Sequence, residues 1–319
     1  MHRTLSSEQR RVGWSASVPF LLVHLAPLAL FWTGVRPIDW AVCAGLYFAR
    51  MFFITGAYHR YFAHRSYKMG RVMQFLMALG GTMAVQKGVL WWAAHHRKHH
   101  KLSDQVGDVH SPKDGLAWSH VGWILSHQHD ETDWKWIRDF AKFPELVWLN
   151  RHFLVPPLAL AATLWLLGGW SMLWCGFFLS TALLYHGTFT INSLAHVWGR
   201  RRYVTRDTSR NNFALALLTL GEGWHNNHHY YMSSTNQGFF WWEIDISYYV
   251  LRMLSWVGLT WDLRKPPQHV LDGNRVRDHE DIGMRPAGQE SAQAREPAEL
   301  ASAELAAAEL AAVEPAAAE

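Results

Sequence analysis

Histidines are concentrated in three short segments of this chain. The first reads His-Arg-Tyr-Phe-Ala-His (59–64), the second His-Arg-Lys-His-His (96–100) and the third His-Asn-Asn-His-His (225–229). Imidazole is a good ligand for iron, zinc, copper and nickel. Because residues three and four apart on a helix are neighbours, the second and third segments can each present three ring nitrogens to one place. The three segments together predict a metal centre.

Eight imidazoles are more than one ion binds, so the segments favour two metal ions. His59 and His64 are five residues apart and would diverge on a continuous α-helix, so we expect the helix that carries His59 to end between them. A structural zinc site would need cysteines or four closed ligands, and the His-Glu-x-x-His motif of zinc proteases does not occur. A site made of neutral nitrogen donors at a membrane surface is suited to iron, which could activate oxygen for a reaction with a lipid substrate.

Carboxylates near these segments are candidates for orienting the ligating imidazoles from behind, as they commonly do in metal sites. Glu222 is the first candidate, because the segment Glu-Gly-Trp-His that it begins is the only one with the Glu-x-x-His form of soluble di-iron bundles. Asp104, Asp108 and Asp207 are weaker candidates for the same role.

The elements that carry these segments are predicted to lie in a membrane. Four apolar segments are each long enough to cross roughly 30 Å of hydrocarbon, namely 18–35, 40–58, 153–169 and 171–191. Basic residues gather near the N-terminus, in 60–151 and in 200–210, which the positive-inside rule places in the cytoplasm. We expect an all-α, multi-pass membrane protein with four transmembrane helices, cytoplasmic termini and a helical cytoplasmic cap that carries the metals. The expected location is the bacterial inner membrane.

Residues 72–92 are also apolar, but they include Gln74, Gln86 and Lys87. A crossing here would put the first two histidine segments on opposite faces of the membrane, and no shared site could form. We therefore expect a helix that packs against the bundle or dips partway into the membrane, with its polar groups covered by protein.

Composition limits the other classes of function. The net charge of +4 is too small and too scattered to indicate a nucleic-acid partner, and the two cysteines, Cys43 and Cys175, form neither a disulfide framework nor a thiolate metal motif. The last part of the chain is rich in Ala, Glu and Pro. We expect a membrane domain at 1–282 and a disordered tail without a catalytic role at 283–319.

Single histidines outside the three segments are more often structural than ligating. His24 and His186 lie inside predicted spans, where we expect them to be hydrogen-bonded or to face a cavity, although an ionisable residue in a membrane is a functional candidate. His95, His110 and His120 lie near the segments. They are equally compatible with orienting ligands and with an ordinary surface role.

The three segments resemble the histidine boxes of membrane fatty acid desaturases, and specifically the acyl-CoA delta-9 (stearoyl-CoA) desaturase group. The resemblance covers about residues 15–265. It includes Asn-Ser-Leu-Ala-His at 192–196, Gly-Glu-Gly-Trp at 221–224 before the third box, and Ser-His-Val-Gly-Trp at 119–123. These are specific matches in several separate parts of the chain.

The resemblance implies a di-iron centre that uses molecular oxygen and two electrons to introduce a cis double bond, of the delta-9 type, into a saturated fatty acyl chain. It implies that Asn192 reaches one metal through water. Trp92 and Thr188 match positions that enclose the bend of the acyl tunnel, and we expect Tyr47 or Met51 to form the tunnel floor. The implied ligands are His59, His64, His96, His99, His100, His196, His225, His228 and His229.

Some positions depart from the group. Lys87, Ala94 and His95 replace residues that contact the CoA headgroup in animal enzymes, so CoA, acyl carrier protein and membrane lipid all stay open as acyl carriers, with CoA favoured. The chain contains no cytochrome b5 or ferredoxin-like segment. The electrons must then come from a separate donor of the ferredoxin, rubredoxin or cytochrome b5 type with its reductase, which the basic cytoplasmic surface could dock.

Two other classes of function stay open. A His-box membrane hydroxylase would use the same metals on a similar scaffold, and analysis of the product for alkene or alcohol separates the two. A membrane haem or metal-transport protein is a more distant alternative, since paired His24 and His186 could suggest haem. The Asn-Ser-x-x-His element, together with the three boxes, favours desaturation.

Overall fold

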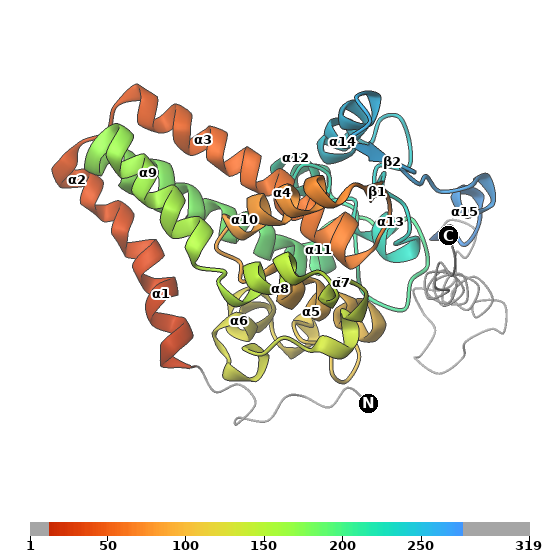
Figure 1. The fold of residues 1–319 in the computed structure, drawn as a ribbon. Helices are drawn as coiled ribbons and strands as arrows, with labels where there is room; N and C mark the ends of the chain where they lie inside the picture. The colour runs from red at the N-terminus through yellow and green to blue at the C-terminus, as the bar shows by residue number, and fades with distance from the viewer. Residues whose placement is uncertain (1–12, 277–319) are drawn as a thin grey trace.

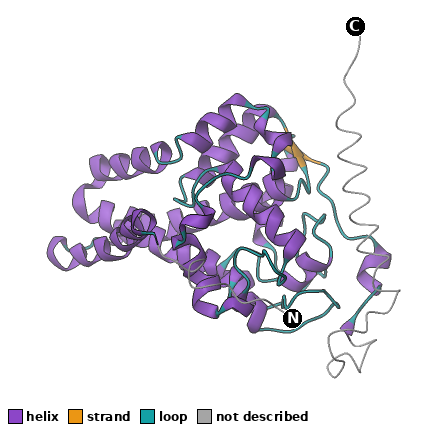
Figure 2. Cartoon of the chain, turned by 90° about the horizontal axis from the view of Figure 1, so that it is seen from below, coloured by secondary structure: helices purple, strands orange, loops and turns teal. Residues whose placement is uncertain are grey.

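The computed structural model describes residues 13–276, and the predicted tail at 283–319 lies outside the described residues. Within the described part nearly all regular structure is helical, which confirms the predicted helical class (Figure 2). The described strands are β1 (Lys68–Met69) and β2 (Thr260–Trp261), which pair antiparallel with Lys68 opposite Trp261 and Met69 opposite Thr260.

The N-terminal helices form an apolar run that turns back at a glycine. The run consists of α1 (Trp14–Leu25), η1 (Ala26–Ala29) and α2 (Leu30–Thr33), and it stops at Gly34, whose φ of 68° favours glycine. The next helix, α3 (Pro37–Phe52), begins with proline, and Asp39 accepts hydrogen bonds from the backbone N–H and the guanidinium of Arg36. A π-helix, η2 (Phe53–Ala63), continues α3 without a break.

A second long apolar run occupies Val155–Val197. It comprises α9 (Val155–Met172), η7 (Leu173–Leu179), α10 (Ser180–Asn192) and α11 (Leu194–Val197). Gly169 has φ 70° and ψ −159°, so the run turns there, at the boundary between the third and fourth predicted spans. Figure 1 shows α1, α2, the start of α3 and α9 projecting together from one side of the molecule.

Within residues 13–276, two helices are long and apolar enough to cross a membrane, Pro37–Ala63 and Val155–Val197, and Ser17–Thr33 is a shorter apolar helix. The second predicted span therefore lies in the first of these helices, and the third and fourth lie in the other, on either side of Gly169. The number of crossings stays a prediction.

The segment after the first histidine box forms two separate helices, α4 (Arg71–Thr82) and α5 (Val89–Leu102). With 12 residues, α4 is too short to cross a bilayer and packs against η2 and α8 (Pro144–Arg151). Its Gln74 is buried and accepts a hydrogen bond from Tyr61 Oη at 2.9 Å. This arrangement agrees with the expected packing of the segment against the bundle.

Short helices and loops build the rest of the described chain. Figure 1 places the histidine-bearing helices α5, α11 and α13 (His225–Tyr230) on the side away from the projecting helices. The remaining helices are η3 (Pro112–Asp114), η4 (Trp118–Gly122), α6 (Trp123–Leu125), η5 (His127–His129), η6 (Trp134–Trp136), α7 (Arg138–Ala141), α12 (Phe213–Leu218), α14 (Ile246–Trp256) and α15 (Gln268–Asp272).

The largest buried apolar cluster surrounds the junction of α3 and η2. Met51, Tyr58 and Phe62 from this junction are completely buried, and they lie in one cluster with Leu90 of α5 and Leu146 of α8. Burial of such side chains contributes about 1.5–3 kcal/mol each. This core therefore packs against both helices that carry the first and second histidine boxes, η2 and α5.

Candidate metal centre

Five of the predicted ligands form one compact group, named here the five-histidine group. Their ligand nitrogens all lie within 4.8 Å of one another. Nε2 of His228 lies 3.0 Å from Nε2 of His59 and 3.0 Å from Nε2 of His100, and His64 and His96 make a further contact of 3.0 Å. The members of the group are His59, His64, His96, His100 and His228.

The other four histidines form a second group, named here the four-histidine group. Ligand nitrogens of His99, His196 and His229 lie within 4.8 Å of one another, and Nε2 of His225 lies 3.1 Å from Nε2 of His196. The two groups adjoin, because the ring centroids of His100 and His229 are 4.5 Å apart. All nine histidines named from the sequence are therefore brought together, in two neighbouring sets.

The second and third boxes were each expected to present all their histidines to one place. Instead, each box contributes histidines to both groups. His96 and His100 of α5 belong to the five-histidine group, whereas His99 belongs to the other. A helix turns by about 100° per residue, so residues four apart point in nearly the same direction and adjacent residues do not. In the third box His228 likewise separates from His229. The expectation was wrong because both helices lie between the two groups.

The first box lies on a π-helix, which the spacing of its residues does not predict. His64 N–H donates to the carbonyl oxygen of His59 at 3.1 Å, a bond between residues five apart. In this wider helix such residues lie one above the other, so the two rings meet, with centroids 4.8 Å apart. The helix does end at Ala63, between the two histidines, as expected.

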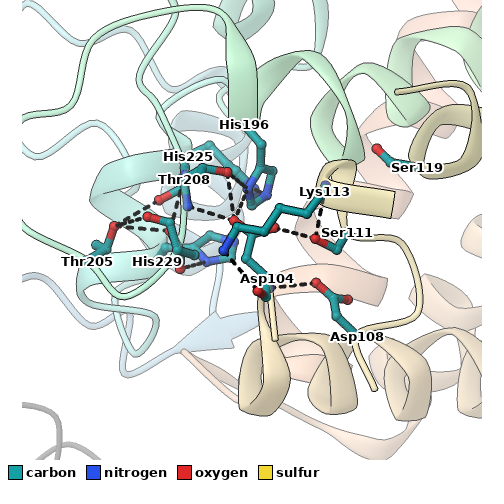
Figure 3. A network of polar contacts seen from close by, with 12 residues as sticks. Asp104, Asp108, Ser111, Lys113, Ser119, His196, Thr205, Thr208, His225 and His229 are labelled. Carbon is teal, nitrogen blue, oxygen red and sulfur yellow. Dashed lines mark hydrogen bonds and ion pairs between the residues drawn. The ribbon is translucent and has the colours of Figure 1, made fainter. Parts of the chain in front are cut away.

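Buried carboxylates contact Nδ1 of four of these rings, the nitrogen on the side away from the neighbouring histidines. Glu222 Oε2 lies 2.6 Å from Nδ1 of His59, and Asp104 Oδ2 lies 3.4 Å from Nδ1 of His196. Asp207 Oδ2 lies 2.7 Å from Nδ1 of His229. A carboxylate at Nδ1 leaves Nε2 as the free electron-pair donor. Figure 3 shows Asp104 and His229 within one network that also holds Thr205 and Thr208.

Asp108, a weaker candidate, accepts a hydrogen bond from Nδ1 of His99 at 2.8 Å. Burial would lower the pKa of His99, but the charge of Asp108 raises this pKa above its ordinary value. In turn His99 offsets the effect of burial on Asp108 and holds the pKa of the carboxyl at about 2. The Asp108 carboxyl is therefore ionised beside His99 at neutral pH.

Most of the other rings are neutral. Burial lowers the pKa of His96, His100, His225 and His228 well below the ordinary value of histidine. A neutral imidazole has one nitrogen with a free electron pair, which is the form that binds metal.

The donor set fits two metal ions. Two largely buried groups of imidazole nitrogens converge, and Nε2 of His229 is buried without a hydrogen-bond partner among residues 13–276. Such a nitrogen costs free energy unless something binds it. Imidazole donors in these numbers suit iron among the common metals, as well as zinc or copper.

Asn192 and the predicted tunnel residues lie around these groups. Asn192 ends α10, and its side chain makes no hydrogen bond with the described residues, while its carbonyl oxygen accepts from Ser119 Oγ at 2.8 Å. Trp92 stacks on His96 with ring centroids 4.9 Å apart. Thr188 Oγ1 accepts a hydrogen bond from Gln86 Nε2 at 2.9 Å.

Tyr47 and Met51 are buried in α3 and face Gly187 of α10. A Cβ atom at Gly187 would lie 2.7 Å from Tyr47 Oη and 2.9 Å from Met51 Cε. The two helices approach closely here because residue 187 has no side chain.

The isolated histidines are engaged in hydrogen bonds. Nε2 of His24 lies 3.1 Å from Nε2 of His186, whose Nδ1 lies 3.0 Å from Nε2 of His120. Nδ1 of His24 contacts Phe20 O, and Nδ1 of His120 contacts Ser193 Oγ. Every ring nitrogen in this chain of three has a partner, and the chain joins α1, η4 and α10.

His95 and His110 behave differently from each other. Nδ1 of His95 bonds to the carbonyl oxygen of Trp91, as in an ordinary helix side chain. His110 is buried with its ring centroid 4.1 Å from that of His99, and its Nδ1 has no partner within the described residues.

Two residues near the five-histidine group were not identified from the sequence. Arg60 is 1% exposed and pairs with both Glu222 (3.0 Å) and Asp245 (2.8 Å). Gln237 Nε2 lies 3.3 Å from Nδ1 of His59 and 3.5 Å from Nδ1 of His228. Arg60 could have been noticed in the sequence, because it is a charged residue between the two histidines of the first box. No neighbouring residue in the sequence indicates a role for Gln237.

Comparison with known proteins gives consistent similarities. A family model described as fatty acid desaturase matches residues 38–267. The chain is 34% identical over 273 residues to the sn-2 palmitoyl-lipid 9-desaturase of Nostoc sp. (strain 36), covering 82% of this chain and 94% of that protein. It is 33% identical over 268 residues to the sn-1 stearoyl-lipid 9-desaturase of Anabaena variabilis, covering 81% and 96%. The Acyl-CoA C20 Delta5-desaturase of Anemone leveillei is 34% identical over 252 residues, covering 78% and 79%.

Proposed function

Because the chain belongs to the fatty acid desaturase family, we propose that it introduces a cis double bond of the delta-9 type into a saturated fatty acyl chain. The reaction removes two hydrogen atoms from adjacent methylenes. It consumes O2, two electrons and two protons, and it forms the alkene and two molecules of water. The observation that carries the proposal is a pair of adjoining, largely buried histidine groups inside the region that the family model matches.

Two iron ions are the proposed cofactor, one in each histidine group. When bound, they supply the oxygen chemistry that an unactivated methylene requires, since such a carbon offers no acidic proton and no leaving group. The nine histidines would hold them, and Asn192 would reach the ion of the four-histidine group through water. The buried carboxylates Glu222, Asp104 and Asp207 support this assignment by occupying Nδ1 of three ligands.

The protein's other contribution is position. A misplacement of about 1 Å can cost on the order of 100-fold in rate, so the acyl chain must be held with one carbon pair beside the metals. We assign Trp92 and Thr188 to the bend of an acyl tunnel, and Tyr47 with Met51 to its floor. The stacking of Trp92 on His96 and the approach of Gly187 to Tyr47 support these roles.

The acyl carrier is proposed to be a membrane lipid, with acyl-CoA as the alternative. The relatives named above include two lipid 9-desaturases and one acyl-CoA desaturase. Lys87, which departs from the acyl-CoA group, has its Nζ 2.7 Å from Asp130 and is already paired. Assays with acyl-CoA in solution and with diacyl lipid in vesicles separate the two carriers.

Four crossings of the bacterial inner membrane, with both termini cytoplasmic, are the proposed topology. The turn at Gly169 within an apolar run of 43 residues supports a third and a fourth crossing there. The requirement that all three boxes share one face supports an even number of crossings between the first and third boxes.

A separate protein of the ferredoxin, rubredoxin or cytochrome b5 type is proposed to deliver the electrons. Lys113 and Arg201 lie beside the four-histidine group, because Lys113 Nζ donates to Asp104 O and Arg201 to Thr205 O, next to Asp207. Neither cation has an ion-pair partner among the described residues. An acidic donor would be attracted to this surface.

Expression in a host that lacks desaturases tests the proposal. Double bonds should appear in the host lipids at the delta-9 position when a competent electron donor is present, and the His228→Ala variant should produce none. An alcohol in place of the alkene would identify a hydroxylase. An unaltered lipid profile with folded, iron-loaded protein and a working donor would contradict the proposal.

A further inference from the structure

An exposed apolar surface adjoins the second predicted span. Val72 on α4 is 76% exposed, and Trp256 and Val257 at the end of α14 are 73% and 69% exposed. Met253 on α14, Leu76 on α4 and Phe213 on α12 are also exposed. These six side chains, named here the interfacial belt, come from three separate parts of the sequence.

The three helices of the belt are neighbours. The pairing of β1 with β2 brings the start of α4 beside the end of α14, since Met69 lies opposite Thr260. Ser247 N–H at the start of α14 donates to Leu220 O just after α12, at 2.9 Å. Figure 1 shows α4, α12 and α14 together beside the end of α3.

Each of these helices buries some of its residues and exposes apolar ones, and each is too short to cross a bilayer. α14 has 11 residues, and it buries Ser247, Tyr248 and Leu251 while Met253 and Trp256 face outwards. Burying a side chain of this size contributes about 1.5–3 kcal/mol. A surface with several exposed apolar side chains is unusual in water, and such a surface usually contacts a lipid or another protein.

We propose that the lipid bilayer covers the belt, so that α4, α12 and α14 lie in the membrane surface, parallel to it. The inference goes beyond the proposed reaction and rests on the proposed membrane topology. The belt is continuous with the span surface, because Tyr47 Oη of α3 donates to Leu218 O of α12 at 2.9 Å, and the adjacent Phe48 is 50% exposed.

The residues around the belt favour lipid over a protein partner. Trp and Tyr concentrate at membrane interfaces, and Trp256, Trp261 and Tyr249 are all exposed here. Exposed Arg252 and Lys265 lie beside them, and basic side chains at this level contact anionic headgroups. A helix with an aromatic and aliphatic face flanked by cations is typical of a segment that lies in the interface.

The contact of the belt with the bilayer would fix the distance between the metal centre and the membrane surface. Thr55 Oγ1 in η2 lies 2.6 Å from Ser247 Oγ of α14, four residues before His59. A bilayer that holds α14 at its surface therefore holds the first histidine box at a fixed distance from the lipid.

Single cysteines in the full-length protein test the proposal, because Cys43 and Cys175 are both buried. Met253→Cys and Val257→Cys place a fluorescent bimane label on the belt. Leu166→Cys, on a 75% exposed position of α9, is the control for lipid, and Gln105→Cys, on an exposed loop, is the control for water. The labelled proteins are placed in lipid nanodiscs, and quenching is measured with aqueous iodide and with lipids that carry a nitroxide near the headgroup or deep in the chain.

At positions 253 and 257 we expect loss of iodide quenching relative to position 105 and strong quenching by the shallow nitroxide. Iodide quenching equal to that at position 105 would overturn the proposal. Protection from both iodide and nitroxide would also overturn it, since a second copy or another protein would then cover the belt. If the label at position 166 is quenched by iodide, the proposed topology itself fails.

Discussion

Glu222 Oε2 lies 2.6 Å from Nδ1 of His59, and both side chains are almost completely buried. The other oxygen of Glu222 accepts from Arg60 at 3.0 Å, and Arg60 also pairs with Asp245 at 2.8 Å. The carboxylate of Glu222 therefore places a negative charge beside His59. This charge favours the tautomer with the proton on Nδ1, so that Nε2 points into the five-histidine group with its electron pair free.

Glu222→Gln is expected to weaken the metal affinity of the five-histidine group by roughly 10- to 100-fold, because the amide removes the charge that sets the tautomer. Iron per chain after dialysis against a chelator measures this. Glu145→Gln is the matched control, since Glu145 pairs with Arg71 at the surface, away from the histidines. Equal iron retention in the two variants would contradict the role assigned to Glu222.

Two adjacent residues are expected to affect different ions. His99 belongs to the four-histidine group and His100 to the five-histidine group, so His99→Ala and His100→Ala should each weaken a different site. Iron content and Mössbauer spectra of the iron-loaded variants distinguish the remaining species. Exposed His269 on α15 provides a control substitution to alanine. Loss of the same spectral component from both variants would show that the two groups do not act as separate sites.

Tyr47 and Gly187 are expected to set the acyl length that the enzyme accepts. Tyr47→Ala should extend the chain length accepted, because it removes a buried ring from the proposed tunnel floor. Gly187→Ala should shorten it, because a Cβ there would lie 2.7 Å from Tyr47 Oη. Gas chromatography of the unsaturated fatty acids made in the host measures both changes.

Phe48→Ala is the control for these variants, since Phe48 follows Tyr47 but is 50% exposed. An unchanged product length in Tyr47→Ala would exclude Tyr47 from the floor. Products of Phe48→Ala should match those of the unaltered protein.

His129 is expected to contribute to acid sensitivity. Burial, helped by nearby His95 and Lys98, lowers the pKa of His129 from 6.5 to about 4. The unfolded chain therefore binds more protons between these values, so the stability is fully present above about pH 6.5 and is lost as the pH falls towards 4. At pH 5 this group should reduce the free energy of unfolding by at most about 2 kcal/mol relative to pH 7.

In His129→Gln the thermal unfolding midpoint should fall less between pH 7 and pH 5 than in the unaltered protein. His127→Gln is the control, because the side chain of His127 is 59% exposed two residues away. The idea fails if His129→Gln and His127→Gln show the same dependence on pH.

The sequence by itself determined the class of the protein and predicted the candidate ligands. The spacing of the histidine boxes, the Asn-Ser-x-x-His element and the apolar runs are local patterns, and helix geometry converts them into neighbouring side chains. Eight of the histidines could be named for this reason, and Glu222 could be named because it lies three residues before His225. The ninth, His196, was named from the resemblance to desaturases. The long apolar runs indicated helices for the same reason.

Only the tertiary structure decided which histidine belongs to which of the two groups. The division of His99 from His100 depends on where α5 lies between the two groups, and the contact of Asp245 with Arg60 joins residues 185 apart in the chain. The π-helix that aligns His59 with His64 depends on packing around η2 rather than on residue type. Contacts of this kind arise from the way that distant helices pack together, and no local pattern of residues specifies that packing.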